Sequence, residues 1–155
     1  MAVNPRRLIL ANLKETLVGI READGYKTTV HDVEIAAKAF AEIKTSQRPW
    51  IGIVPGREDW TYQPAGGIRS TWNVALIIHQ ARFTKDQDLQ FDRLNEMLDD
   101  VVAILNVDTT RGGCAVMTTI AGLESDEGAN EGGAGMVIRL EIVYFRTTGA
   151  SYCRS

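Results

Sequence analysis

Few residues of this chain have the type and spacing that catalysis or metal binding requires. The 155 residues include two histidines, His31 and His79, and neither has a cysteine or carboxylate nearby at metal-ligand spacing. Cys114 and Cys153 are the only cysteines, too few for a disulfide framework, and we expect both to be reduced. The pattern indicates no metal centre, and the two imidazoles are better interpreted as surface or partner-facing groups.

Glycine-rich and acidic segments offer no stronger case for chemistry. Gly112-Gly113 and residues 132–135 precede no predicted helix, and the chain lacks a Gly-Lys-Ser/Thr phosphate loop and a Gly-x-Ser-x-Gly elbow. Acids on the polar side of an amphipathic helix are typical of a solvated face, whereas catalytic carboxylates lie in clefts that shift their pKa. The acids in question are Asp88, Asp92, Glu96 and Asp99. We therefore predict that the chain is not an enzyme and has no catalytic residue, cofactor or metal ion.

Length and charge limit the remaining classes of protein. A chain with 45% hydrophobic and 24% charged residues fits one folded domain. The net charge of −3, with Arg6-Arg7 as the only basic pair, argues against tight nucleic-acid binding, which needs cations to neutralise phosphates. No apolar run approaches the roughly 20 residues of a membrane span, and residues 1–7 do not resemble a signal peptide.

Hydrophobic periodicity predicts an α+β fold. Apolar residues spaced by three and four predict helices over 5–23 and 86–105, and both can pack on one face of a mixed or antiparallel sheet. The second helix has its apolar stripe at Phe91, Leu94, Leu98, Val101 and Leu105. We expect a single domain over residues 1–147 and a flexible C-terminal tail over 148–155.

Strands are predicted from β-branched residues and alternation, over 26–33, 50–54, 71–81, 114–121 and 136–147. Three segments between them are less regular. Residues 34–44 fit either a helix or a strand ending in a helical turn. Residues 57–70 fit a loop or the tip of a long hairpin, and 122–135 fit a mobile loop of the kind that is functional or disordered.

Apolar residues on the predicted outer side of the sheet are the least expected feature. Alternation places Ile77, Val143 and Phe145 opposite the core-facing residues, where a solvated sheet would have polar ones. Trp60 and Tyr62 lie in a Pro/Gly-rich segment with no visible core, and aromatics are enriched in interfaces. Either a helix or loop of the same chain covers these residues, or a neighbouring subunit does.

The order of elements and one short motif resemble a known family. The most recognisable stretch is Pro-x-Ile-x-Ile-x-x-Gly-x-Glu, from Pro49 to Glu58, between an opening helix and a closing strand that ends at Arg146. Over residues 5–147 the chain is similar to the tail terminator, or tail completion, proteins of long-tailed bacteriophages. The alanine-rich stretch 36–44 departs from the family's strand and turn, which leaves the pairing of the second strand open.

The resemblance implies a virion structural protein. It implies a homo-oligomer, a hexameric ring that caps the tail tube and joins it to the neck or head-completion protein, with DNA only passing through the lumen. The ring would stand at the tail–neck junction of the virion, assembled in the host cytoplasm, without a membrane partner. Candidate interface residues, from the two irregular segments and the outer sheet face, are Arg57, Asp59, Trp60, Tyr62, Ile77, Glu124, Asp126, Val143 and Phe145.

Two other interpretations stay open. The chain fits another head–tail connector or neck adaptor, which copy number and position in purified particles would distinguish. It also fits a small ligand-binding domain or enzyme with a site beneath the Trp60/Tyr62 segment, for which His31, His79 and Asp59 are the candidate titratable residues.

Overall fold

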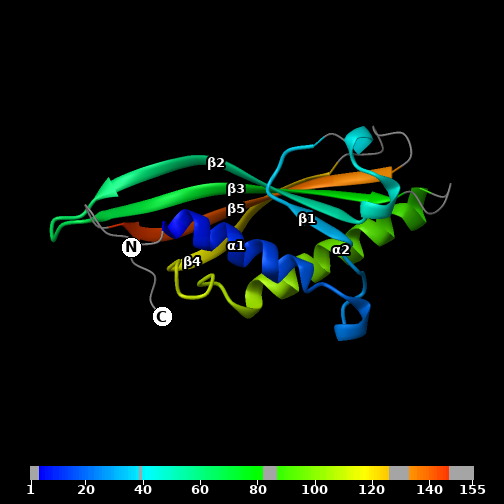
Figure 1. The fold of residues 1–155 in the computed structure, drawn as a ribbon, viewed down its shortest axis with the longest axis horizontal. Helices are drawn as coiled ribbons and strands as arrows, with labels where there is room; N and C mark the ends of the chain where they lie inside the picture. Colours follow the sequence, from blue (N-terminus) through cyan, green and yellow to red (C-terminus); the bar gives the residue numbers. More distant parts are fainter. Residues whose placement is uncertain (1–3, 39, 82–86, 126–132, 147–155) are drawn as a thin grey trace.

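One mixed sheet with two helices on one face makes up the domain (Figure 1). The computed structural model describes residues 4–38, 40–81, 87–125 and 133–146, so the predicted tail over 148–155 lies outside the described residues. Five strands lie in the order β1-β2-β3-β5-β4, with β1 parallel to β2 and the other pairs antiparallel. The α+β expectation is confirmed.

Helix α1 (Pro5–Val18) begins where the sequence predicts and ends earlier. Asn4 caps it, because its side-chain oxygen accepts a hydrogen bond from the Arg6 backbone N–H at 3.0 Å, and Pro5 occupies the first turn. The predicted end at residue 23 is wrong, since Gly19 closes the helix and a separate 3₁₀ turn, η1 (Glu22–Asp24), follows.

The next strand is much shorter than predicted. Only β1 (Asp32–Glu34) pairs with the sheet, although the sequence predicts a strand over 26–33. The backbone N–H groups of Lys27 and Thr28 donate to the side chain of Asp100 at 3.0 and 2.8 Å instead of to a strand. The ambiguous segment after β1 is irregular, with two 3₁₀ turns, η2 (Phe40–Glu42) and η3 (Thr45–Gln47).

Strands β2 (Trp50–Tyr62) and β3 (Ile68–Ala81) form a long hairpin. The predicted end of β2 at Pro55-Gly56 is wrong, because a register shift between Pro55 and Glu58 absorbs these residues and the strand continues. Proline is tolerated at such bulges. The alternative reading of residues 57–70 as a hairpin tip is confirmed, and Gly66 and Gly67 make its turn at φ 89° and 96°.

Strands β4 (Met117–Ser125) and β5 (Gly133–Arg146) form a second hairpin. The predicted loop over 122–135 is wrong at both ends, because residues 122–125 pair with β5 and residues 133–135 pair with β3. Residues 126–132, which include the candidate Asp126, lie outside the described residues. Strand β5 also pairs with the whole of β3, so β3 and β5 form the centre of the sheet.

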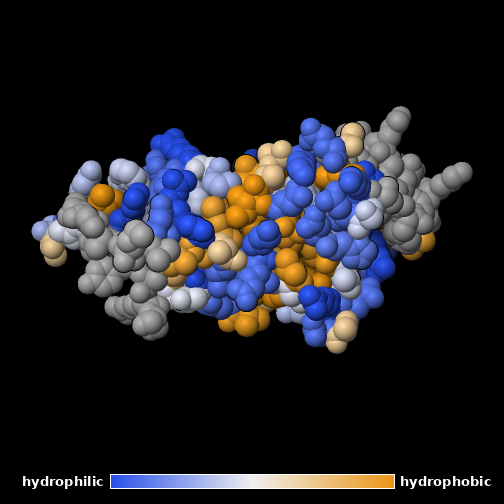
Figure 2. Space-filling view, in the orientation of Figure 1, coloured by the Kyte–Doolittle hydropathy of each residue, from blue (hydrophilic) through white to orange (hydrophobic). Residues whose placement is uncertain are grey.

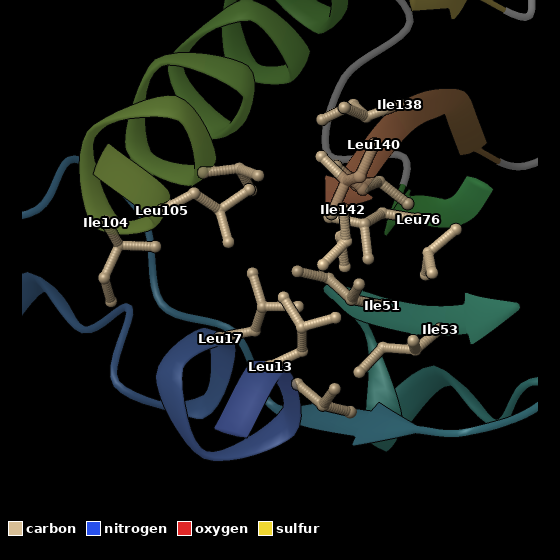
Figure 3. Packing of buried hydrophobic residues seen from close by; sticks show 14 of the residues in the cluster. Leu13, Leu17, Ile51, Ile53, Leu76, Ile104, Leu105, Ile138, Leu140 and Ile142 are labelled. Atoms are coloured by element: carbon tan, nitrogen blue, oxygen red, sulfur yellow. The ribbon is translucent and has the colours of Figure 1, made fainter. Parts of the chain in front are cut away.

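The core lies between the sheet and the two helices (Figure 3). Alternation in β3 and β5 is confirmed, since the residues predicted to face the core are at most 3% exposed: Trp72, Val74, Leu76, Ile78, Met136, Ile138, Leu140, Ile142 and Tyr144. Helix α2 (Gln87–Val107) adds Met97 and Ile104 to its predicted stripe, whereas Phe91 is 38% exposed. Each fully buried Leu or Ile stabilises the fold by about 1.5–3 kcal/mol.

The segment between α2 and β4 holds two further features. Arg111, buried and at φ 50°, donates from its guanidinium to the Leu105 carbonyl at 2.6 Å and so covers the C-terminal end of α2. Cys114 is disulfide-bonded, so the expectation that it is reduced is wrong; cysteine count alone does not report proximity in space. Among the described residues, no helix is long and apolar enough to cross a membrane.

Candidate functional site

The β2–β3 hairpin extends past the start of α1 and leaves sheet surface without a helix over it (Figure 1). We call residues 57–71 the arm. Cross-strand register places Trp60 opposite Ser70 and Tyr62 opposite Ile68, on the side of the sheet that carries the helices. Arg57 and Asp59 point to the other side by alternation. The arm therefore presents two different surfaces.

A polar cluster joins the arm to the body of the domain at Glu58. The Glu58 carboxylate accepts hydrogen bonds from the Ser70 and Tyr144 hydroxyls, and Arg6 of α1 lies 3.4 Å from its other oxygen. The Arg6 guanidinium also lies over the Trp72 ring, 4.6 Å from the centroid, in a cation–π contact. Residues from α1 and three strands thus meet at the base of the arm.

The electrostatics of this cluster favour an ionised glutamate and a neutral tyrosine. Burial raises the pKa of Glu58, but the hydrogen bonds from Ser70 and Tyr144 and the charge of Arg6 outweigh burial and hold it below its usual value. Burial, with the nearby Glu58 carboxylate, raises the pKa of Tyr144 to about 12. Ser70 and Tyr144 are fully buried, which fits a structural role better than access for a substrate.

Beyond the cluster, the arm exposes its aromatic residues. Trp60 is 51% exposed and Tyr62 71%, although both lie in a regular strand. Arg146, at the end of β5, places its guanidinium 5.3 Å from the centroid of the Trp60 ring. On the opposite side Arg57 and Asp59 form an ion pair at 2.8 Å. Figure 2 shows most of the hydrophobic residues of that face gathered in its middle. Trp60 and Tyr62 do not belong to the core cluster of buried residues.

The outer face of the sheet, opposite α1 and α2, is partly covered and partly bare. Of the three candidates on it, Phe145 is 46% exposed, Ile77 is half-buried, and Val143 is buried at 9%. Met117, paired with Val143, is 53% exposed. Val143 is therefore already covered within one protomer, whereas Phe145 and Met117 still expose apolar surface.

One end of the outer face is covered by the chain itself. Trp50 is fully buried there and stacks on His79, with ring centroids 5.7 Å apart. The irregular segment before β2 crosses this end, since a side chain at Gly52 would lie 2.5 Å from the Ala36 carbonyl oxygen, and Ile43 is 2% exposed. At this end of the sheet, a segment of the same chain therefore covers the outer face, and no neighbouring subunit is needed there.

Toward the β4 edge the outer face is more open. A cavity of about 290 Å³ opens on this face beside Ile77, Val137 and His79. Another cavity, of about 350 Å³, lies on a different part of the domain. Glu124, a candidate from the sequence, forms an ion pair with Arg139, and both side chains are about 60% exposed. Glu141, between them and the arm, has no ion pair among the described residues.

The structure does not bring together the residues that an enzyme interpretation needs. His31 lines the larger cavity with Glu22, Gln80 and Arg93, whereas His79 lies against Trp50 on the outer face. Asp59 lies in the arm, nine residues beyond Trp50 and so about 30 Å along the strand. Groups of three or more possible metal ligands are absent from the described part of the chain.

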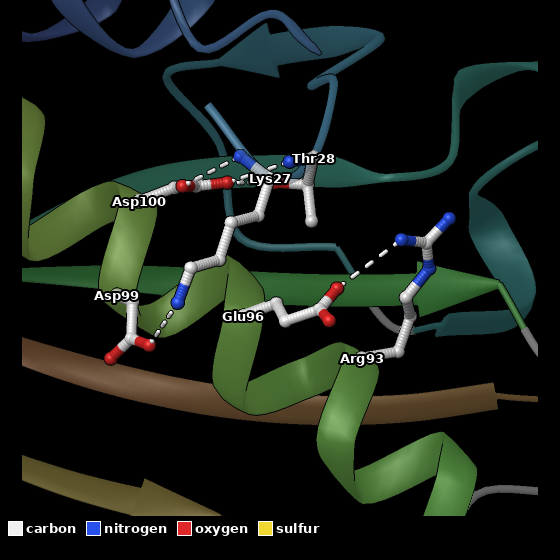
Figure 4. Close-up of polar contacts among 6 residues, drawn as sticks. All are labelled: Lys27, Thr28, Arg93, Glu96, Asp99 and Asp100. Carbon is white, nitrogen blue, oxygen red and sulfur yellow. Dashed lines mark hydrogen bonds and ion pairs between the residues drawn. The ribbon is translucent and has the colours of Figure 1, made fainter. Parts of the chain in front are cut away.

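Two acids of α2, Asp99 and Asp100, bind the chain after α1, whereas Glu96 pairs within the helix (Figure 4). The predicted solvated acids Glu96 and Asp99 form ion pairs with Arg93 at 3.2 Å and Lys27 at 2.9 Å. Asp100, which the sequence does not single out, is 4% exposed and accepts three hydrogen bonds from Lys27 and Thr28. A charged residue interrupting the buried side of a helix is the signal that would have identified it.

Glu58, Arg6 and Tyr144 are likewise absent from the sequence-based candidates. They come from α1, β2 and β5 and meet only in the folded sheet, so no local pattern reports their contact. No protein-family model matches the chain, and no curated protein is significantly similar to it. The geometry of the arm and the outer face is therefore the basis for a functional proposal.

Proposed function

We propose that the chain is a virion structural protein of a long-tailed bacteriophage: a tail terminator whose ring caps the tail tube and joins it to the neck or head-completion protein. The observation that carries the proposal is the arm, which exposes Trp60 and Tyr62 at 51% and 71% on a hairpin with continuous cross-strand pairing from Glu58 to Tyr62. Aromatics of this size are enriched at interface cores, and a hairpin in a continuous sheet holds them ready for a partner at low entropic cost.

The second support comes from the motif that carries the family resemblance. Its final residue, Glu58, anchors the arm to Arg6, Ser70 and Tyr144. The motif thus has a structural purpose here, since it leads β2 through a bulge and fixes the direction in which the arm leaves the domain. A fixed direction is what a subunit needs if a head-to-tail contact is to close into a ring.

The proposed role of the chain is assembly rather than catalysis. The acidic balance of the chain, −3 overall, also suits a ring through which DNA passes, because a lumen with few cations would not hold phosphates. A lumen wall in which Lys and Arg predominate over Asp and Glu would contradict this part of the proposal.

The test is the assembly state of the purified chain, alone and with tail tubes. Size-exclusion chromatography with light scattering and negative-stain imaging should show a ring of about six copies, free or on the end of a tube. A chain that stays monomeric in both settings overturns the proposal. A position elsewhere in the neck of purified particles, with a different copy number, favours a neck adaptor instead.

A further inference from the structure

Among the described residues, the arm and the outer face both leave apolar side chains exposed or half-buried. On its helix side the arm places Tyr62, Ile68 and Arg146 in one cross-strand row, with Trp60 in the next. On the outer face, Ile77 pairs with Val137 in one row and Ala75 with Arg139 in the next. Each of Ala75, Ile77 and Val137 is only half-buried. Because a contact between them would join two different patches of the protomer, it would be head-to-tail.

The charges left over on the two surfaces are opposite. On the arm, Arg57 pairs with Asp59 and Glu58 with Arg6, which leaves Arg146, stacked on Trp60, as the excess cation on the helix side. On the part of the outer face that carries Ala75, Ile77 and Val137, Glu124 pairs with Arg139, and the neighbouring Glu141 has no ion pair among the described residues. Complementary charges of this kind orient a contact and set its register.

The spacing of the two surfaces also matches. Tyr62 and Arg146 lie in one row with β3 between them, which separates their backbones by roughly 10 Å. Glu141 lies diagonally from Ala75 and two rows from Ile77, at roughly 8 and 14 Å. An arm that places Arg146 against Glu141 therefore sets its aromatic side chains over the apolar rows of the neighbouring sheet.

We infer that the helix side of the arm of one copy docks on the outer sheet face of a second copy of this chain, with Trp60 and Tyr62 over Ala75, Ile77 and Val137 and Arg146 against Glu141. The inference deepens the proposed function, because it names the contact that closes the ring. Two sheets stacked face to face bury both apolar surfaces, and the contact uses each surface once per protomer.

A charge-swap experiment tests the pairing of Arg146 with Glu141. Arg146→Glu and Glu141→Lys should each weaken self-association about tenfold or more in sedimentation velocity, because each places like charges together. Mixing the two single variants should restore assembly, since every contact in an alternating ring then joins opposite charges. A mixture that associates no better than either variant alone overturns the inference. Neither substitution touches the core, and thermal unfolding checks that both variants are folded.

A second experiment tests the aromatic anchors directly. Trp60→Ala and Tyr62→Ala should each lower self-association about tenfold, while Phe91→Ala, which truncates an exposed aromatic on α2, should leave it unchanged. A photo-crosslinking residue in place of Tyr62 should join the arm to the strand around Ile77 or Val137 of another copy. Crosslinks that map elsewhere on this chain, or only to a tube or neck protein, contradict the inference.

Failure of this contact can be distinguished from failure of the proposed function. Rings that form with native stability in the Trp60→Ala, Tyr62→Ala and Arg146→Glu variants overturn this contact and leave the ring itself intact. A wild-type chain that forms no ring, either alone or on tail tubes, overturns the proposed function together with the contact.

Discussion

The Tyr144 hydroxyl donates a hydrogen bond to the Glu58 carboxylate, joining β5 to β2 across the intervening strand β3. Ser70 of β3 donates to the same carboxylate, and Arg6 approaches it from α1. The base of the arm is therefore fixed by three strands and a helix at once. Because the arm carries the exposed aromatics, this cluster links the stability of the domain to the geometry of the proposed interface.

Removing the Tyr144 hydroxyl should destabilise the domain. Tyr144→Phe keeps the buried ring but leaves the Glu58 carboxylate with one donor fewer, and a lost hydrogen bond to a charged, largely buried group costs about 1.5–3 kcal/mol. Urea unfolding followed by circular dichroism measures the change. Tyr62→Phe is the matched control, since the same hydroxyl is removed from a 71% exposed residue and stability should not change. Equal effects of the two substitutions would contradict a structural role for the cluster.

Glu58 should make the domain less stable in acid. Its pKa is lowered in the folded state below the ordinary value of 4.5, so folding favours the ionised form. Its stabilising contribution is fully present above pH 4.5 and is lost as pH falls through the lower folded value. The free energy of unfolding, measured from neutral pH downward, should fall less steeply in Glu58→Gln than in the wild type. Parallel curves would contradict the assignment.

Tyr144 should make the domain less stable in alkali. Its pKa rises from 10.0 to about 12 in the folded state, so folding favours the neutral phenol. The stabilisation is complete below pH 10.0 and is lost as pH rises toward the folded value of about 12. Ultraviolet titration should show one tyrosine that ionises at higher pH than the others in the wild type. This tyrosine should be missing from the titration of Tyr144→Phe. A late group that persists in the variant would contradict the prediction.

The sequence predicts the parts of this fold in which pattern and environment agree. Strands β3 and β5 alternate cleanly because one face packs on the helices, and their core faces are as predicted. Thr28 and its neighbours have strand propensity but are held by Asp100, a residue 72 positions away. Pro55-Gly56 predicts the end of a strand, but β2 continues past it through a bulge.

The candidate site was predictable only in part, for a related reason. Trp60 and Tyr62 are identifiable as aromatics without a core, and their exposure follows from the length of the hairpin. Glu58 ends the recognisable motif, but nothing in its local sequence indicates its contacts with Arg6 and Tyr144, which arise only in the folded sheet. Alternation predicts that Val143 lies on the outer face, and an apolar residue there suggests exposed surface. Val143 is nevertheless buried within the protomer, because alternation gives the face of a residue and not its cover.

Asp100 should be far more important for stability than its neighbour Asp99. Asp100 is buried and accepts hydrogen bonds from Lys27 and Thr28, so Asp100→Ala leaves these donors unpaired at a cost of about 2–4 kcal/mol. Asp99→Ala removes an exposed ion pair with Lys27, which contributes about 0–1 kcal/mol. Denaturant unfolding of the two variants gives the comparison. A loss for Asp99→Ala as large as that for Asp100→Ala would contradict the ranking.

A methyl group at Gly52 should disturb the cover over the outer face. The added carbon would lie 2.5 Å from the Ala36 carbonyl oxygen and 2.4 Å from the Trp50 ring, so Gly52→Ala forces the crossing segment away from the sheet. Overpacking of this kind costs about 1–3 kcal/mol. Gly122→Ala is the matched control on the same face, since its nearest neighbour is an Arg139 side-chain carbon at 4.0 Å. Hydrogen exchange should show faster opening around residues 36–48 in Gly52→Ala alone. Unchanged exchange there, with normal stability, would mean that the segment packs on the sheet less tightly than the contacts at Gly52 require.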